Sequence, residues 1–448
     1  MKRITIGIPV EYGFHEVKKF IYSGFAQRLS AKFNIVWLAL RKESVEFDEV
    51  LARAGFPIIY FDQSSLPNSR LKVERLDRMV RNSWMLNMGI GSFHNYRKIQ
   101  RKTLKSFIFG NSLFKNLLSN IVLREVKKNY FNDQLAVLFY ENNIDAIFST
   151  SCNSTFSKYI FVTAFHQNID SWYLINSWKD LYVDNSISFD FLKGIFVWSD
   201  EMKQDYRKHI PHLNPSIFHV TGNPSFDTIV TARPVYSRTH YAEKYSISEG
   251  AQWLYYTMMP PGLVNDELDT IITVANELCK HWSAKEKVIM IRRNPNHHKN
   301  EFSSVVFPDN VVLTEHFIVY DKVKDMIVQS EEGELEWIDL LNYTDINLSV
   351  PSTVTLEFLI KGKPVINIGF DHTGQHDHRI DQHFGAGFYK PLFLKKEVFP
   401  CMDLKDLKEN IDEADLLVVN KEILPSMEAS LKIESILSSY YSPIEQKQ

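Results

Sequence analysis

Short apolar runs rich in β-branched residues alternate with longer amphipathic stretches along most of the chain. The runs have the length of buried strands, and the stretches between them show helical spacing. This alternation predicts βαβ units built on parallel sheets. In the first half of the chain, strands are expected at residues 4–9, 34–40, 57–61, 146–149, 171–176, 195–199 and 218–221.

The same rhythm returns in the second half after a break. Strand signals lapse between residues 227 and 250, where Arg233-Pro234 and Gly250 interrupt the pattern. A chain of 448 residues exceeds one ordinary core, so we expect two domains, residues 1–235 and 236–448. Second-half strands are expected at 253–257, 287–292, 311–314, 345–349 and 364–368, and helices at 266–282, 334–342, 354–361 and 404–412.

One stretch of the second domain, residues 345–370, combines a strand, a polar turn, a helix and a second strand. In an open α/β sheet, ligands bind beyond the carboxyl ends of the strands. Ser352 and Thr353 occupy that turn, at the positive end of the helix, where a phosphate is favoured. Glu357 lies one turn further along the same helical face and suits a sugar hydroxyl. Hydroxyl groups that can donate hydrogen bonds to a phosphate, followed by a carboxylate that can bind a sugar, indicate a nucleotide site.

Two further polar turns follow predicted strands. Arg292, Asn294 and His297 come at the carboxyl end of the strand 287–292, where cations suit a diphosphate. Gly222 and Asn223 end the last strand of the first domain, in a turn that we expect to face the other domain. Both turns are therefore expected to contribute to donor binding.

These motifs resemble the landmarks of GT-B glycosyltransferases and their relatives. The residues that carry the resemblance are Thr221-Gly222-Asn223-Pro224 with Asp227, the turn 292–295, and Ser352-Thr353 with Glu357 ahead of Gly362-Lys363-Pro364-Val365. The relatives include non-hydrolysing UDP-N-acetylglucosamine 2-epimerases, CDP-glycerol glycerophosphotransferases, and the Kdo transferases of bacterial capsule or lipopolysaccharide. The resemblance implies the α/β GT-B fold, in which two Rossmann-like domains face each other across a cleft.

The resemblance also implies roles for individual residues. The C-terminal domain would hold a nucleotide-sugar donor, and the N-terminal domain would position a glycan or lipid-linked acceptor. Ser352 and Thr353 would bind the donor phosphate, Glu357 the ribose, and Arg292 and Asn294 would line the donor pocket. GT-B enzymes that use CMP-sugars commonly carry His-Pro where this chain has Asn294-Pro295. Both CMP-linked and UDP-linked donors therefore stay open.

An inverting transferase needs a base that deprotonates the acceptor hydroxyl, and the first β-to-α turn of the N-terminal domain is its usual source in this fold. Glu11 is a candidate base in that turn, and His15 is a second. The alternative is that Glu11 or Glu16 caps the helix that follows. Asp180 follows another predicted strand and is a lesser candidate.

The loop after the strand 364–368 is dense in histidine and aspartate and looks at first like a metal site. Ligands from one short loop spread poorly around an ion, and no HExxH pair supports them. We therefore expect a polar donor-binding loop that includes His376, with neither a metal nor a cofactor. The resemblance agrees, because GT-B enzymes neutralise the leaving group with a helix terminus and cations.

Charge is unevenly distributed along the chain. The segment 70–128 carries fourteen Lys and Arg residues against three acidic ones, a net of +11 in a chain of net charge -3. Bulky apolar residues alternate with these cations, which suits an anionic membrane surface. Ordinary helices with solvated basic faces are the alternative. Nucleic acid is the weakest option, because no binding motif accompanies the charge.

This basic and aromatic insertion, at about residues 64–130, is unlike the compact epimerases and favours a transferase. No long uncharged apolar run and no signal pattern occurs, and the three cysteines are widely spaced. We therefore expect a cytoplasmic enzyme at the inner face of the membrane, an inverting glycosyltransferase of bacterial surface polysaccharide assembly. A nucleotide-sugar 2-epimerase, a glycerophosphotransferase and a non-catalytic sugar-binding protein are the alternatives.

Overall fold

A computed structural model of the chain describes residues 3–11, 16–41, 46–62, 66, 75, 111–152, 154–178, 180, 187–210, 213–261, 264, 266–295, 297, 302–315, 318–321, 326–385, 389, 391–417 and 428–442. The chain forms two compact units. Unit 1 comprises Met1–Asp227, Tyr320–Val328 and Pro425–Gln448, and unit 2 comprises Thr228–Val319 and Gln329–Leu424.

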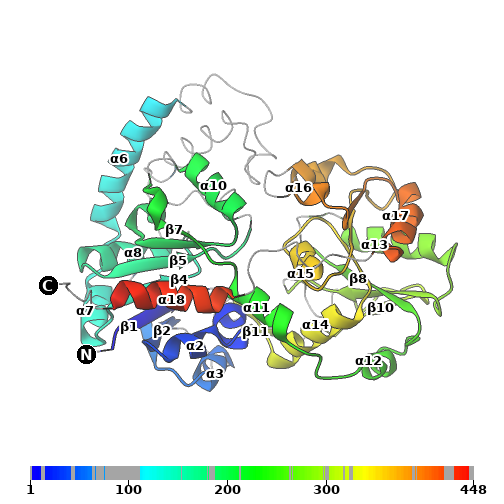
Figure 1. Ribbon diagram of the computed structural model, residues 1–448, viewed down its shortest axis with the longest axis horizontal. Helices are drawn as coiled ribbons and strands as arrows, with labels where there is room; N and C mark the ends of the chain where they lie inside the picture. The colour runs from blue at the N-terminus through cyan, green and yellow to red at the C-terminus, as the bar shows by residue number, and fades with distance from the viewer. Residues whose placement is uncertain are drawn as a thin grey trace. The chain divides into compact units, whose positions relative to one another are not determined.

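Unit 1 is built on a seven-stranded sheet in which every neighbouring pair is parallel (Figure 1). In spatial order its strands are β3 (Ile58–Asp62), β2 (Asn34–Arg41), β1 (Thr5–Val10), β4 (Ala146–Ser149), β5 (Asp170–Leu174), β6 (Gly194–Val197) and β7 (Phe218–Val220). Each of the seven strands expected from sequence is present, with ends within two residues of the prediction.

Helices cover both faces of this sheet. The π-helix η1 and the helices α2 and α18 pack on one face through large apolar side chains such as Phe20, Phe25 and Trp37. The helices of unit 1 are η1 (Val17–Tyr22), α2 (Phe25–Ser30), α3 (Glu46–Arg53), α6 (Ser112–Asn129), α7 (Asp133–Glu141), α8 (Thr155–His166), η3 (Ile187–Phe191), α10 (Asp200–His209), η4 (Pro215–Ile217) and α18 (Ala429–Tyr441), with α11 (Pro224–Thr231) at the junction of the units.

Unit 2 is built on a six-stranded sheet, again parallel throughout. In spatial order its strands are β10 (Val311–Leu313), β9 (Lys287–Arg292), β8 (Gln252–Thr257), β13 (Ile346–Ser349), β14 (Val365–Ile368) and β15 (Val398–Cys401). Its helices are α12 (Arg238–Lys244), α13 (Glu267–Cys279), α14 (Glu331–Tyr343), α15 (Val354–Ile360), η5 (His378–Ile380), α16 (Asp381–Gly385), η6 (Leu392–Leu394), η7 (Leu404–Asp406) and α17 (Leu407–Asp415). A separate two-stranded sheet pairs β11 (Ile318–Asp321) with β12 (Met326–Gln329).

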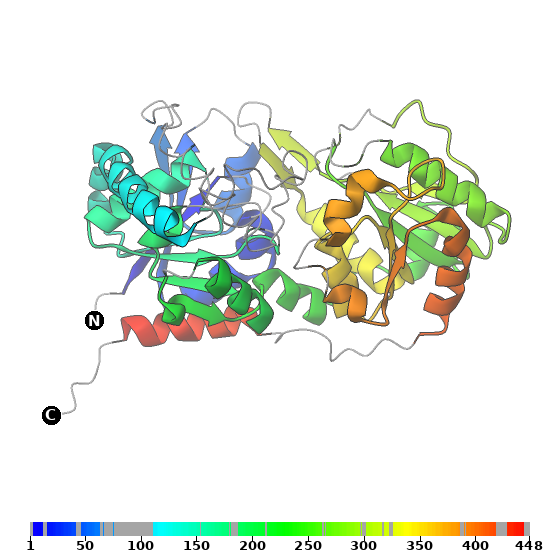
Figure 2. The same cartoon turned by 90° about the horizontal axis from the view of Figure 1, so that it is seen from above.

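The C-terminal helix α18 belongs to unit 1, although the sequence places residues 236–448 in the second domain. Its Ile433 and Leu437 are fully buried in the core of unit 1, and Figure 2 shows the helix, in red, alongside that unit. Burying each of these side chains stabilises the packing by about 1.5–3 kcal/mol. The carboxylate of Asp227 accepts hydrogen bonds from the N–H groups of Ala429 and Ser430 at 3.0 and 2.8 Å. Asp227, a landmark of the family resemblance, therefore caps a helix 200 residues further along the chain.

Candidate functional site

The strand order of unit 1 reverses between β1 and β4. The chain proceeds from β1 to β2 and β3 on one side and from β4 to β7 on the other, so the loops after β1 and β4 diverge. Ligands of doubly wound sheets bind at this switch point, beyond the carboxyl ends of the strands. Glu11 follows β1 there, and Thr150 and Ser151 follow β4.

Glu11 is held at the start of α8 by serine hydroxyls. Ser151 Oγ donates to one carboxylate oxygen at 2.9 Å, and Ser157 Oγ donates to the other. Ser154, which caps α8, also lies beside this carboxylate. Burial raises the pKa of Glu11, and the hydroxyls oppose that shift. The arrangement orients a carboxylate of increased basicity at the switch point.

Glu16 lies close to Glu11 and is almost completely buried, with 1% of its surface exposed. One of its oxygens is 3.5 Å from Thr150 Oγ1, and the other has no hydrogen-bond partner among the described residues. Burial first, and then the charge of Glu11, raise the pKa of Glu16 to about 7. Glu16 stands at the start of η1 but makes no capping hydrogen bond. It was considered from sequence only as a helix cap, because burial is not visible in a sequence.

Asp180 stabilises the turn that follows β5. Its Oδ2 accepts hydrogen bonds from the Tyr173 hydroxyl at 3.1 Å and from the N–H groups of Asn176 and Ser177, each at 2.8 Å. The ammonium group of Lys19 donates to the carbonyl oxygen of Asn176 at 2.7 Å. These contacts give Asp180 a positioning role in the turn. His15 lies outside the described residues.

Gly222 and Asn223 follow β7 and belong to unit 1. Gly222 has φ +93°, a backbone conformation that favours glycine. Asn223 is buried, and its side-chain oxygen accepts from the N–H of Ser225 at 3.1 Å. The pair therefore forms the turn that leads into α11, and the other predicted donor-binding residues belong to unit 2.

In unit 2 the strand order reverses between β8 and β13. Arg292, at the end of β9, stacks on Trp337 of α14, with 3.7 Å between the guanidinium carbon and the ring centroid. The indole N–H of Trp337 donates to Glu357 of α15 at 2.8 Å. Trp337 thereby joins two residues that the sequence assigned to the donor site separately. It was missed because its position on α14 matches an ordinary apolar helix face.

Ser352 and Thr353 occupy the turn between β13 and α15, as expected. Thr353 is the N-cap residue but makes no capping hydrogen bond. Neither hydroxyl has a hydrogen-bond partner within the described part of the chain, and both residues are partly exposed. Two polar groups therefore remain available at the switch point of unit 2.

A buried polar chain supports the strand ends beneath that turn. The Asn347 amide donates to the carbonyl of Tyr255 at 2.8 Å, and Ser349 Oγ donates to Asn347 Oδ1 at 2.9 Å. Asn367 on β14 donates to the carbonyl of Ser349 at 3.3 Å. Buried polar groups that are hydrogen-bonded in this way fix the relative positions of the strands.

The segment after β8 is held from two sides at Met259. Its N–H donates to the Glu267 carboxylate at 3.0 Å, and its carbonyl lies 3.1 Å from His297 Nε2. The N–H of His297 donates to the carbonyl of Asn294 at 2.9 Å and closes the turn after β9. His297 is buried, and its Nε2 holds the segment after β8 through the carbonyl of Met259. Burial raises the pKa of Glu267 to about 8.

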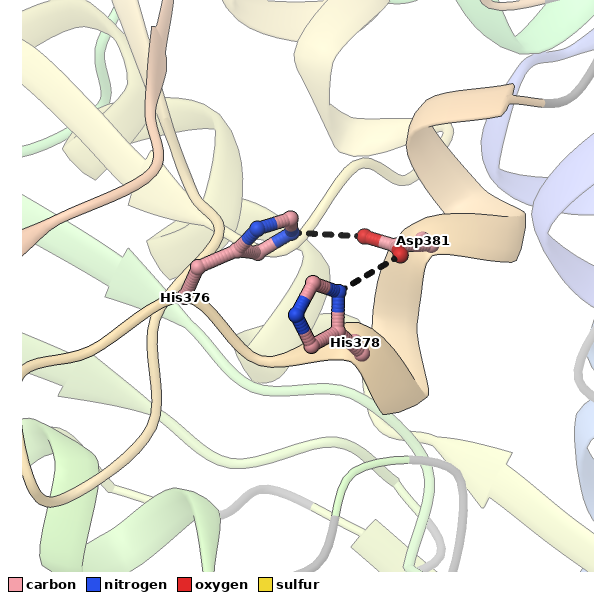
Figure 3. A group of neighbouring side chains, drawn as sticks. All are labelled: His376, His378 and Asp381. Atoms are coloured by element: carbon pink, nitrogen blue, oxygen red, sulfur yellow. Dashed lines mark hydrogen bonds and ion pairs between the residues drawn. The ribbon is translucent and has the colours of Figure 1, made fainter.

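His376 lies in a group that sequence reasoning did not expect to converge. His376, His378 and Asp381 turn toward one another (Figure 3). Their possible metal-ligand atoms all lie within 4.8 Å of one another. The sequence favoured a donor-binding loop over a metal site because ligands from one loop spread poorly. His378 begins η5 and Asp381 begins α16, while His376 precedes both helices and pairs with Phe370 at the end of the strand.

Comparison with known proteins identifies the fold. No family model matches the chain, and no curated protein matches its sequence. Among solved structures, S. aureus MnaA with UDP aligns with a TM-score of 0.56 and 10% identity, covering 98% of this chain and 97% of that chain. UDP-GlcNAc 2-epimerase from Methanocaldococcus jannaschii aligns at 0.54 and 11%, covering 98% and 100%. The Neisseria meningitidis UDP-GlcNAc 2-epimerase bound to UDP-GlcNAc aligns at 0.53 and 13%, also covering 98% and 100%.

The fold is GT-B. Two Rossmann-like units on parallel sheets confirm the class expected from sequence. The low identities establish the architecture alone and leave the activity to the residues of the site.

Glu267→Gln should change how stability depends on pH. The pKa of Glu267 is about 8 in the folded state, against an ordinary value of 4.5. The folded state therefore binds the proton more tightly, and wild-type stability should fall as pH rises from 4.5 through 8. The glutamine variant should lack this loss, a difference on the order of 4 kcal/mol between pH 5 and pH 9 in the urea-derived free energy of unfolding.

Glu277→Gln is the matched control on the same helix. A hydrogen bond from Lys280 lowers the pKa of Glu277, so this substitution should produce at most a small effect of the opposite sign. Equal pH dependence in wild type and Glu267→Gln would contradict the assignment of a protonated Glu267.

Proposed function

We propose that this protein is a nucleotide-sugar enzyme, an inverting glycosyltransferase that acts in bacterial surface polysaccharide assembly, such as capsule, O-antigen or lipooligosaccharide. The observation that carries the proposal is the group at the switch point of unit 2. Arg292 stacked on Trp337, Glu357 bonded to the same indole, and the available hydroxyls of Ser352 and Thr353 provide a cation, a carboxylate and phosphate donors.

In this proposal each group meets one part of the donor. Ser352 and Thr353 bind a phosphate, and Arg292 stabilises the negative charge that develops on the leaving nucleotide. Glu357 is assigned to the ribose, because a carboxylate accepts hydrogen bonds from sugar hydroxyls. Two solved structures of the same fold contain UDP or UDP-GlcNAc, which supports a uridine nucleotide ahead of a cytidine one.

Glu11 of unit 1 is the proposed base for the acceptor. The acceptor oxygen attacks the anomeric carbon, the bond between that carbon and the phosphate oxygen breaks, and its electron pair leaves with the nucleotide. The proton of the acceptor hydroxyl passes to the Glu11 carboxylate. Burial favours this step, because the raised pKa of Glu11 makes the carboxylate a stronger base.

A nucleotide-sugar 2-epimerase is the second candidate, favoured by the solved structures with that activity in their names. Incubation of the protein with UDP-GlcNAc alone separates the two reactions. An epimerase converts UDP-GlcNAc without an acceptor, whereas a transferase that lacks its acceptor leaves the configuration at C2 of the sugar unchanged. Turnover of CDP-glycerol would instead identify a glycerophosphotransferase.

Arg292→Met should weaken nucleotide binding. Loss of the guanidinium removes the charge that meets the phosphates, so the Kd for UDP should rise about 10- to 100-fold, or about 1.4–3 kcal/mol. Isothermal titration with UDP, CMP and CDP measures this change. Lys285→Met is the control, because Lys285 is exposed and precedes the amino end of β9. Equal UDP affinity in wild type and Arg292→Met would contradict the donor site.

Glu11→Gln should lower turnover about 10²- to 10⁴-fold and leave the Kd of the donor unchanged, because amides do not accept the proton. Single-turnover assays with donor and a lipid-linked acceptor measure the rate. Glu201→Gln, at an exposed carboxylate on α10, should behave as wild type. Wild-type turnover in Glu11→Gln would exclude Glu11 as the base.

The proposed acceptor places the protein at the inner face of the membrane. None of the described helices is long and apolar enough to cross a bilayer. On α6, Leu117 and Ile121 are exposed and share one helical face with Arg124 and Lys128. Apolar groups beside cations on an exposed face suit an anionic lipid surface. Most of the basic segment 70–128 before α6 lies outside the described residues.

Replacing both Leu117 and Ile121 with Asp should reduce binding to vesicles that contain phosphatidylglycerol by at least about tenfold, because apolar contact is lost and negative charge is added. Vesicle co-sedimentation at low and high salt measures it. Leu431→Asp is the control, at a comparably exposed leucine on α18. Unchanged vesicle binding in the double variant would contradict a membrane contact through α6.

A further inference from the structure

The loop after β14 is folded by its own backbone hydrogen bonds. The N–H of Asp371 donates to the carbonyl of Gln375 at 3.0 Å, and the N–H of Asp377 donates to the carbonyl of Gly369 at 2.8 Å. These bonds close a compact turn and return His376 to the end of the strand. The position of His376 is therefore determined by the backbone, although its side chain is exposed.

His376, His378 and Asp381 form a compact set of nitrogen and oxygen atoms at this loop (Figure 3). His376 Nε2 lies 2.6 Å from Asp381 Oδ1, and His378 Nδ1 lies 3.1 Å from Asp381 Oδ2. Two imidazoles and one carboxylate are a common donor set for zinc and similar ions. Three protein ligands leave a fourth position open, as in sites that bind water or substrate.

The charges around this loop favour a cation. The Nε of Arg379 lies 2.7 Å from Asp377, and its terminal nitrogens lie 3.9 Å from Asp371 and 3.8 Å from Asp266. Three carboxylates therefore share this one guanidinium, and Asp381 adds a fourth carboxylate beside the two histidines, so acidic groups outnumber the arginine at this loop. A phosphate alone would be repelled here, whereas a divalent cation would be attracted and would in turn attract a phosphate oxygen.

The same loop packs against the switch point of unit 2. Ile380, between His378 and Asp381 in the chain, is buried against Met259 and Val350. These two residues follow β8 and β13, the strands between which the order reverses. The three polar side chains therefore belong to a segment anchored beside the proposed nucleotide site.

We propose that His376, His378 and Asp381 bind one divalent transition-metal cation of the class of Zn²⁺, whose open coordination position accepts a phosphate oxygen of the nucleotide. The binding of the cation stands on the three side chains alone, whereas its contact with the nucleotide rests on the proposed function. This proposal reverses the expectation, drawn from sequence, that the loop binds the donor without a metal.

Cobalt titration of the tag-free, full-length protein, after removal of metals with a chelator, tests the cation site. We expect one equivalent of Co²⁺ to bind with visible absorption bands and to be displaced by Zn²⁺. His376→Ala and His378→Ala should each weaken binding at least tenfold. His372→Ala is the matched control, since His372 is exposed on the same loop but outside the group. Circular dichroism confirms that the variants fold.

Absence of stoichiometric cobalt bands, or equal affinity in wild type and His376→Ala, would overturn the cation site. A second titration, of UDP with and without Zn²⁺, tests the contact with phosphate. Zn²⁺ should lower the Kd of UDP at least tenfold in wild type but not in His376→Ala or His378→Ala. An unchanged Kd would overturn that contact. If UDP fails to bind in either state, the proposed function fails while the cobalt result still decides the cation site.

Discussion

A single reversal of strand order in each sheet determines where both candidate sites lie. In a parallel sheet all carboxyl ends point to one edge, and successive loops normally cross the same face. Where the order reverses, between β1 and β4 in unit 1 and between β8 and β13 in unit 2, the loops leave toward opposite faces and a crevice remains. Glu11 directly follows β1, and Ser352 lies in the short turn between β13 and α15, so both residues lie at these two positions.

Carboxylates at the two switch points differ in how their burial is compensated. Glu11 accepts hydrogen bonds from two serine hydroxyls and Glu357 accepts one from an indole N–H, so the burial of each carboxylate is partly compensated. Glu16 lies 3.5 Å from the Thr150 hydroxyl and near the backbone N–H groups of Glu11 and Glu16, and the charge of Glu11 adds to the cost of its ionisation. The pKa of Glu16 is therefore raised to about 7, whereas the serine hydroxyls around Glu11 oppose the rise that burial causes there. Two carboxylates in one crevice thus acquire different roles from their surroundings.

Sequence patterns predicted the sheets well, because a buried parallel strand is a short apolar run that local composition marks clearly. Among the elements that were not predicted, two have clear physical reasons. Pro400 argues against a strand in sequence, but β15 is an edge strand, where a missing N–H is tolerated. The helix α18 joins unit 1 through Ile433 and Leu437, and no local signal states which of two cores an amphipathic helix will join. The same limit applies to the sites, because residue type located Arg292 and Glu357 but not the Trp337 that connects them.

The charged groups at the two switch points differ between the units. Unit 1 presents Glu11 and Glu16 at its switch point, which suits the acceptance of a proton and disfavours a phosphate. Unit 2 presents Arg292 and free hydroxyls, which suit a phosphate, beside a loop whose carboxylates would repel it. A phosphate beside this loop meets less repulsion if the negative loop is itself neutralised. A cation held by His376, His378 and Asp381 would supply this neutralisation. The loop that otherwise repels a phosphate would then contribute to binding it.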